Sequence, residues 1–150
     1  MKEVLREIGL IARSFEAIAN IEFKSIGLSK NQYIYLVRIG EEAGIILEAL
    51  CDHLKVDRST ASRAVNKLVD DDMIYKIDEK NTGKRVKLFL TSKGEEAFDL
   101  LNREEMHSVD RALEGLSDEE IQVLVSNLKH IRMNVEPDWE NVKKGIKRLY

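Results

Sequence analysis

The sequence predicts a mainly α-helical protein with one small β-hairpin. Apolar residues recur at helical spacing near both ends of the 150-residue chain. The alternation typical of strands is confined to residues 73–77 and 86–90, and a polar, glycine-containing stretch joins them. With 43% hydrophobic residues, a chain of this length can form one domain with its own core, predicted to span residues 1–150.

Two apolar helices are predicted first. The second covers residues around 33–39, and the first carries a stripe at helical spacing made of Val4, Leu5, Ile8, Ile11, Ala12, Phe15, Ile18 and Ala19. Together with the helices predicted after the hairpin, the outer helices carry more apolar side chains than a small domain needs for its core, although packing in the core is the simpler account of each single residue.

Two short helices joined by a tight turn follow, at residues 46–54 and 58–69. Leu47, Leu50 and Leu54 keep a helical spacing, and Asp57 is a suitable N-cap for the second helix. This is the pattern of a helix-turn-helix, in which the second helix enters the major groove of DNA. An ordinary pair of amphipathic helices has the same spacing, so both interpretations stay open at this point.

The second of these helices is two-sided. Ala61, Ala64, Val65 and Leu68 fall on one arc, which predicts contact with the core. The opposite side carries hydroxyls, which reach phosphates or bases, an amide that can pair with adenine, and cations, of which arginine can make two bonds to guanine. The predicted DNA-contacting residues are Arg58, Ser59, Thr60, Ser62, Arg63, Asn66 and Lys67.

The hairpin adds a second basic element. In its second strand three apolar residues alternate with Arg85, Lys87 and Phe89, which predicts one face against the helices and a mostly cationic face in solvent. Lys80, Lys84 and Arg85 are predicted to hold this wing along a phosphate backbone or in a minor groove. Taken alone, the same charges would fit a solvated turn.

Two long helices are predicted after the hairpin. Thr91 can cap one that runs to about Leu113, and Ser117 with Glu120 fits the capping box of another that runs to Val135. The last segment, residues 136–150, is predicted to add a further packing helix, because four apolar residues keep helical spacing: Trp139, Val142, Ile146 and Leu149. Its basic residues favour a solvated face over DNA contact.

Charge is distributed unevenly. The whole chain has a formal net charge of −3, but residues 55–93 contain ten basic and six acidic residues, a net charge of +4, which leaves −7 for the remainder. Positive potential is therefore concentrated on the helix-turn-helix and hairpin, and DNA binding with a steep salt dependence is expected.

The chain resembles the multiple-antibiotic-resistance regulator (MarR) family of winged-helix transcription factors. The resemblance is carried by residues 54–68, 77–85, 90–94 and 115–120, in this order and spacing. It implies a winged helix-turn-helix lobe at residues 44–93 and a homodimer formed by residues 1–25 and 95–150. It also implies a repressor that binds a palindromic operator in double-stranded DNA and is released by a small aromatic or phenolic ligand held between the dimer helices and the winged helix.

Two departures from the family pattern stand out. The wing usually has an Asp-x-Arg-Asp-x-Arg-like pattern, whereas Lys80 and Asn81 take its middle places here, so wing contacts are less secure than helix contacts. The helix near Leu47 usually has a hydroxyl residue as its cap, and this chain has Ile46 instead. The start of that helix is expected to be displaced or poorly capped.

Other classes of function lack their motifs. The sequence contains no glycine-rich phosphate loop, no Gly-x-Ser-x-Gly elbow and no His-Glu-x-x-His pair, so no enzyme and no cofactor are predicted. No metal site is expected, since His107 has Arg111 one turn later. Cys51 is the single cysteine and is expected to be a buried small residue in a reducing cytoplasm. No apolar run long enough to cross a membrane is present.

Two alternatives remain at the level of sequence. A winged-helix module that binds a partner protein would use the same fold, and a DNA-binding factor without any effector would use the same site. DNA binding requires Arg63, Lys67, Lys84 and Arg85 to converge on one surface.

Overall fold

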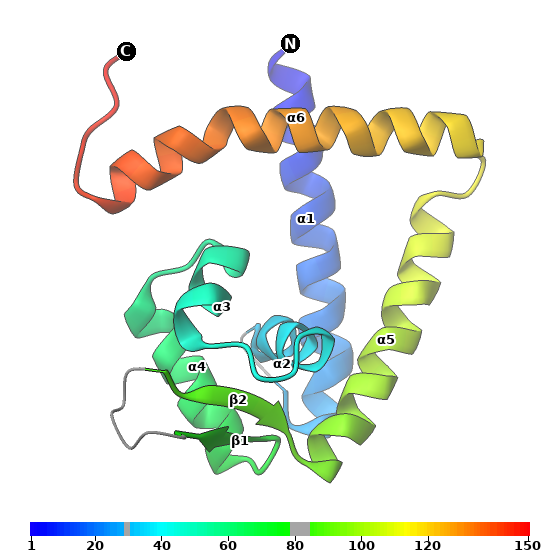
Figure 1. The fold of residues 1–150 in the computed structure, drawn as a ribbon. Coiled ribbons are helices and arrows are strands. Elements are labelled where there is room, and N and C mark those ends of the chain that lie inside the picture. Colours follow the sequence, from blue (N-terminus) through cyan, green and yellow to red (C-terminus); the bar gives the residue numbers. More distant parts are fainter. Residues whose placement is uncertain (29–30, 79–84) are drawn as a thin grey trace. The chain divides into compact units, whose positions relative to one another are not determined.

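The computed structural model describes residues 1–28, 31–78 and 85–150, which form two compact units, Met1–Glu104 and Glu105–Tyr150. Its elements are α1 (Lys2–Glu22), η1 (Phe23–Ile26), α2 (Gln32–Glu41), α3 (Leu47–Leu54), α4 (Arg58–Asp70), β1 (Ile74–Ile77), β2 (Lys87–Leu90), α5 (Ser92–Ala112) and α6 (Asp118–Lys143) (Figure 1). The predicted mainly helical fold with one hairpin is confirmed. The predicted domain limits, 1–150 with a lobe at 44–93 and dimer segments at 1–25 and 95–150, remain predictions.

The starts of α3 and α4 match the expectations from sequence. Ile46 is the N-cap of α3 and provides no side-chain hydrogen bond, so this helix begins where predicted but is poorly capped. Asp57 caps α4 and accepts a hydrogen bond from the backbone N–H of Thr60. The turn between them is made by Lys55, whose φ of 54° is left-handed. Its backbone N–H donates to the carbonyl of Cys51 and closes α3.

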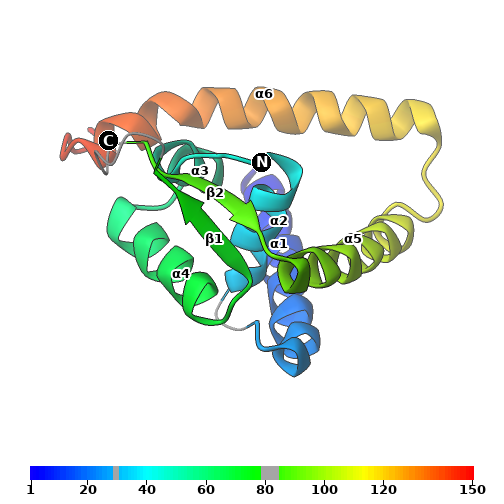
Figure 2. The same ribbon diagram turned by 60° about the horizontal axis from the view of Figure 1, so that its bottom comes forward.

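The core of the first unit joins every element from the end of α1 to the start of α5. Figure 2 shows the hairpin between α4 and α2, and contacts link α4 to β1 and α2 to β2. The largest fully buried side chains are Leu28, Leu36, Ile39, Leu50, Leu68, Ile74, Leu88 and Leu101. Cys51 is also buried, as expected. Burial of these side chains supplies most of the driving force that fixes α4 and the hairpin as one body.

The hairpin is antiparallel, with Ile74 opposite Leu90 and Lys76 opposite Leu88. The sequence did not indicate that residues 44–46 also pair with β2. The N–H of Gly44 donates to the carbonyl of Leu88 at 2.8 Å, and the N–H of Leu88 donates to the carbonyl of Ile45 at 3.0 Å. This pairing ties the start of α3 to the hairpin.

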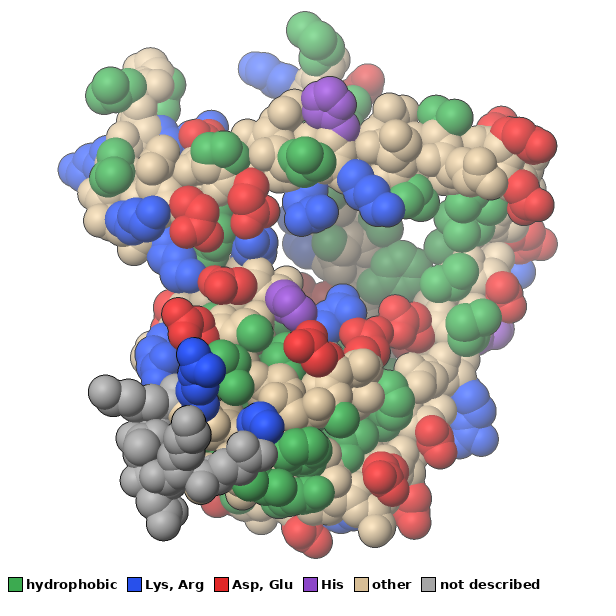
Figure 3. Space-filling view, viewed as in Figure 1, with side chains coloured by type: hydrophobic (Ala, Val, Ile, Leu, Met, Phe, Trp, Pro, Cys, Tyr) green, Lys and Arg blue, Asp and Glu red, His purple; other side chains and the backbone are tan. Residues whose placement is uncertain are grey.

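The outer face of the hairpin differs from the mostly cationic face expected. Phe89 stacks on Tyr75 with ring centroids 5.5 Å apart, and Lys87 is only partly exposed. Figure 3 shows hydrophobic side chains gathered over the hairpin. The aromatic pair forms because Tyr75 and Phe89 lie directly opposite each other, where cross-strand rings stabilise a sheet.

Thr91 connects the hairpin to α5. Its hydroxyl donates to the carbonyl of Asp72 at 2.6 Å and accepts from the N–H of Gly94 at 3.0 Å, so the predicted cap is confirmed. Gly94 lies so close to the hairpin that a Cβ on it would be 1.9 Å from the carbonyl oxygen of Met73. Only glycine allows this approach.

The second unit begins with the last part of α5 and is dominated by α6. The capping box of Ser117 and Glu120 is present as predicted, with both reciprocal hydrogen bonds formed. The hydrogen bond that the Glu120 carboxylate accepts from the Ser117 backbone N–H, followed by the influence of the Ser117 side chain, lowers the pKa of the Glu120 carboxyl. None of the α6 side chains is buried.

The predicted end of this helix at Val135 is wrong, because α6 continues to Lys143 with Pro137 inside it. A proline removes one intrahelical hydrogen bond but its φ is compatible with a helix. The helix predicted to run through Ile146 and Leu149 is also wrong. Gly145 has a φ of 83°, its left-handed backbone follows the end of the helix, and both residues lie beyond it.

The Gly94 contact predicts a specific cost. Gly94→Ala is expected to lower the free energy of unfolding by about 3 kcal/mol, because the new methyl group forces the hairpin away from α5. Urea unfolding followed by circular dichroism measures the change.

Gly9→Ala is the matched control. It lies within α1, and its new Cβ would meet only the flexible end of Arg13 at 3.1 Å. A gain of about 0.5–1 kcal/mol is expected there, since alanine favours a helix over glycine. Equal effects of the two substitutions would contradict the close approach at Gly94.

Candidate nucleic-acid interface

The two faces of α4 have opposite environments. Ala61, Val65 and Leu68 are buried in the core, with exposed fractions of 0–2%. The other side is open to solvent: Arg58, Ser59, Arg63, Asn66 and Lys67 are exposed, and Thr60 and Ser62 are partly exposed. The structure therefore brings all seven residues predicted from the sequence onto the accessible side of one helix.

Asp57 organises the first turn of α4. Its Oδ1 accepts from the Ser59 hydroxyl at 2.5 Å and from the Thr60 N–H at 2.9 Å, and its Oδ2 accepts from the Thr60 hydroxyl at 2.6 Å. These hydrogen bonds, the one from the Ser59 hydroxyl foremost, hold the pKa of the Asp57 carboxyl well below its ordinary value.

This network changes what two of the predicted residues offer. A hydroxyl has a single proton to donate, and those of Ser59 and Thr60 are both directed at Asp57. Phosphate oxygens are acceptors only, so neither hydroxyl can donate to them without leaving the cap. The hydroxyl of Ser62 is used by no hydrogen bond among the residues that the structure describes.

The two cations in the middle of α4 are held differently. An Arg63 nitrogen, Nη2, lies 3.5 Å from the Thr60 hydroxyl, a long contact that leaves the guanidinium largely unrestrained. The Lys67 ammonium forms an ion pair with Asp71, one turn later on the same helix. Of these two cations, Arg63 is therefore the one that can reach a ligand without first losing an ion pair.

Lys76 is a site residue that sequence reasoning missed. It lies on β1 opposite Leu88, whose side chain is buried, so it shares the face of the hairpin directed at α4. Its ammonium donates to Oδ1 of Asn66 at 2.6 Å. The signal available in the sequence was the strand alternation, because the residue paired with a leucine that faces the helices lies on that same face of the hairpin.

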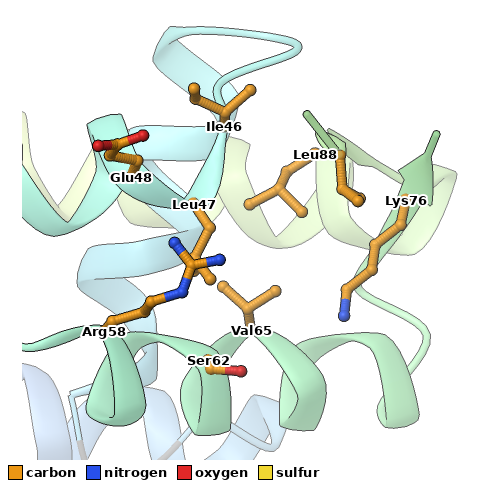
Figure 4. A pocket seen from close by; sticks show the side chains of 9 residues that line it. Ile46, Leu47, Glu48, Arg58, Ser62, Val65, Lys76 and Leu88 are labelled. Atoms are coloured by element: carbon orange, nitrogen blue, oxygen red, sulfur yellow. The ribbon is translucent and has the colours of Figure 1, made fainter. Parts of the chain in front are cut away.

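A small hollow of about 130 Å³ lies between α3, α4 and the hairpin. Figure 4 shows the Arg58 guanidinium and the Lys76 ammonium directed into this space, above Ser62 and Val65. Glu48 lies at its edge, and Leu47 and Leu88 supply apolar walls. The hollow therefore brings one further cation, Lys76 of the hairpin, beside Arg58 and Ser62 of α4.

The predicted wing contacts divide into two groups. Lys80 and Lys84 lie outside the described residues, whereas Arg85 is described and exposed beside the start of β2. Figure 3 shows Lys and Arg side chains gathered at the edge of the first unit, near α4 and the hairpin.

A second, larger hollow of about 600 Å³ lies between α2 and α4. Its lining is mostly apolar, with contributions from Ile34, Val56 and Ala64, and Arg63 and Lys67 border it. Within residues 1–28, 31–78 and 85–150 no group of three or more metal-ligating side chains is found. No helix in those ranges is long and apolar enough to cross a membrane.

Comparisons with known proteins also indicate a DNA-binding helix-turn-helix protein. The sequence profile described as the MarR family matches residues 26–85. A MarR family transcriptional regulator of Listeria monocytogenes, crystallised with a 26mer DNA, is 49% identical, with a TM-score of 0.95 and full coverage of both chains. The chain belongs to the MarR family of helix-turn-helix transcriptional regulators. Members of this family are DNA-binding regulators and not enzymes.

Further MarR-type relatives support the assignment. The HTH-type transcriptional regulator YybA of Bacillus subtilis is 49% identical over 150 residues, covering all of both chains. A MarR protein of Peptoclostridium difficile is 34% identical, with a TM-score of 0.86 and coverage of 93% of this chain and 91% of that one. The winged helix-turn-helix predicted from the sequence is thereby confirmed.

The capping network makes the stability of this MarR-type lobe depend on pH. Because the folded pKa of Asp57 lies below its ordinary value of 3.8, the carboxylate stabilises the fold above pH 3.8, and this contribution is lost as the pH falls further. Asp57→Asn keeps a capping side chain but does not titrate. We expect the wild type to lose stability relative to Asp57→Asn between pH 5 and pH 2.

Urea unfolding at several pH values measures this difference. Asp70→Asn removes a carboxyl at the opposite end of α4 and is the control. A difference between wild type and Asp57→Asn that stays constant from pH 7 to pH 2 would contradict the role assigned to the cap.

Proposed function

We propose that this protein is a homodimeric repressor that binds a palindromic operator by inserting α4 into the major groove. The observation that carries the proposal is the two-sided environment of α4, with one face fixed in the core and the other presenting Ser62, Arg63 and Asn66 to solvent. An α-helix fits the major groove, where bases expose distinct sets of donors and acceptors. The 49% identity to the Listeria regulator crystallised with DNA supports this mode of binding.

Individual roles follow from what each side chain offers. Arg63, largely unrestrained, is proposed to read a guanine, whereas Arg58 and Lys67 contact phosphates. Ser62 has a hydroxyl available to donate to DNA. The hydroxyls of Ser59 and Thr60 instead donate to the Asp57 carboxylate and stabilise the start of α4. Lys80, Lys84 and Arg85 are proposed to hold the wing to the DNA backbone.

A second copy of the chain is proposed to cover apolar surface that each unit leaves exposed. In the first unit α1 exposes Val4, Leu5, Leu10, Ile11, Phe15, Ile18 and Ile21. In the second unit α6 exposes Val123, Leu124, Val125, Leu128, Met133, Val135 and Val142. Many large apolar side chains exposed along one helix mark an interaction surface. Two-fold symmetry would then present two recognition helices to two half-sites of one operator.

Release by a small aromatic or phenolic ligand is also proposed, with the protein acting on DNA in the cytoplasm. The resemblance implies a ligand held between the dimer helices and the winged helix. We propose instead the hollow between α2 and α4, because its volume of about 600 Å³ and its mostly apolar lining suit a small organic ligand. Arg63 and Lys67 border it, so a bound acid would occupy cations that the operator also needs.

The assignment of Arg63 leads to a binding test. Arg63→Ala is expected to weaken binding to the specific operator by about 1–3 kcal/mol, because a bidentate contact with guanine is lost. Fluorescence anisotropy measures this on the chain's own upstream DNA, with scrambled DNA and a salt series. Arg111→Ala is the control, since it removes another exposed cation, at the end of α5 and outside the surface proposed to bind DNA.

The outcomes separate the competing functions. Equal losses on operator and scrambled DNA would make Arg63 a phosphate contact. Weak, equal binding of the wild type to both DNAs and to a random duplex pool would favour the protein-interaction module. Unchanged operator affinity across a screen of aromatic acids would favour a DNA-binding factor without an effector.

The dimer proposal has its own test. Leu128→Lys is expected to weaken dimerisation at least about tenfold, because a charge would be buried in the interface. Since Leu128 is 39% exposed in the single chain, its replacement leaves the fold of one chain intact. Sedimentation equilibrium measures the dissociation constant, and Lys129→Glu, one residue further along α6, is the control. A wild-type protein that stays monomeric at micromolar concentration would contradict the homodimer.

A further inference from the structure

The hydrogen bond between Lys76 and Asn66 joins the hairpin to the reading face of α4. Asn66 lies on the same face as Ser59, Ser62 and Arg63, at spacings of seven, four and three residues. Lys76 reaches it from β1, and its ammonium lies 2.6 Å from the Asn66 Oδ1. Both side chains are exposed, so the pair is open to a partner that approaches α4.

This contact fixes the orientation of the Asn66 amide. An ammonium group carries donors only, so the amide atom that faces it has to be the carbonyl oxygen. The amide nitrogen Nδ2 branches from the same carbon and is directed away from Lys76. Asn66 therefore presents its two N–H donors to an approaching base, with a positive charge close beside its acceptor.

Such an arrangement is poorly matched to adenine. The usual contact between asparagine and adenine has Nδ2 donating to N7 while Oδ1 accepts from the N6 amino group. Here the N6 amino group of adenine would have to share Oδ1 with the Lys76 ammonium. The two donors would lie side by side, and the positive charge of the ammonium would repel the amino hydrogens. Guanine presents two acceptors, N7 and O6, on the same edge.

We infer that Lys76 is a positioning residue that turns Asn66 from a reader of adenine into a reader of guanine. Nδ2 of Asn66 donates to one acceptor of the guanine edge, and a remaining proton of the Lys76 ammonium is available to the other. The inference rests on the proposed insertion of α4 into the major groove. It replaces the pairing with adenine that the sequence suggested for Asn66.

The experiment compares base preference in four proteins: the wild type, Asn66→Ala, Lys76→Met and Lys76→Arg. Each is used to select binding sites from a random-sequence DNA duplex pool, and affinities are then measured with single-base variants of the selected site. The position read by Asn66 is the one in each half-site at which Asn66→Ala loses its preference. Melting temperatures establish that each variant is folded.

The expected results differ between the variants. The wild type prefers guanine over adenine at that position by at least about fivefold, the range expected for a good base contact. Lys76→Met shifts the preference towards adenine, because Oδ1 is released, whereas Lys76→Arg retains guanine. Lys67→Met is the matched control: it removes a neighbouring charge on the same surface and is expected to lower affinity with unchanged base preference.

Three results would overturn the inference: a wild-type preference for adenine at that position, an unchanged preference in Lys76→Met, or an unchanged preference at every position in Asn66→Ala. They are distinct from failure of the proposed function. If the wild-type protein selects no sequence at all from the pool, insertion of α4 into the groove is itself wrong.

Discussion

The carboxylate of Asp57 sets the geometry on which the rest of the recognition surface depends. It satisfies the first turn of α4 through the Thr60 N–H and both neighbouring hydroxyls, so the helix begins at Arg58. A helix that begins there directs Ala61, Val65 and Leu68 into the core. The same rotation leaves Ser62, Arg63 and Asn66 facing solvent. The cap therefore fixes where α4 begins, and burial of its apolar side chains fixes which residues can face a partner.

The hairpin contributes more than a basic wing. It is tied to α3 through Gly44 and Ile45, to α5 through Thr91, and to α4 through Lys76. Because these links join it to α3, α4 and α5, the hairpin is held in place against the recognition helix. A residue from another element can then orient a base-reading side chain such as Asn66 before DNA binds, so that no further conformational entropy is lost on binding.

Exposed apolar side chains on α1 and α6 explain why a lobe of this size carries such long outer helices. The core of the first unit is complete without most of α1, whose only buried residue is Ala19. In the second unit, no residue of α6 is fully buried. In a single chain, both helices therefore leave apolar side chains exposed to water. This is the physical basis for proposing that a second copy covers them.

The sequence by itself determined the order and type of the elements, the caps at Asp57, Thr91 and Ser117, and the exposed face of α4. These features depend on local periodicity and on hydrogen bonds between residues a few positions apart, which a sequence displays directly. Tertiary structure decided the rest. The pairing of residues 44–46 with β2, the approach of Gly94 to Met73 and the bond from Lys76 to Asn66 all join segments distant in sequence. No local pattern encodes which amide oxygen will face which ammonium, because that follows only from how the packed elements are placed.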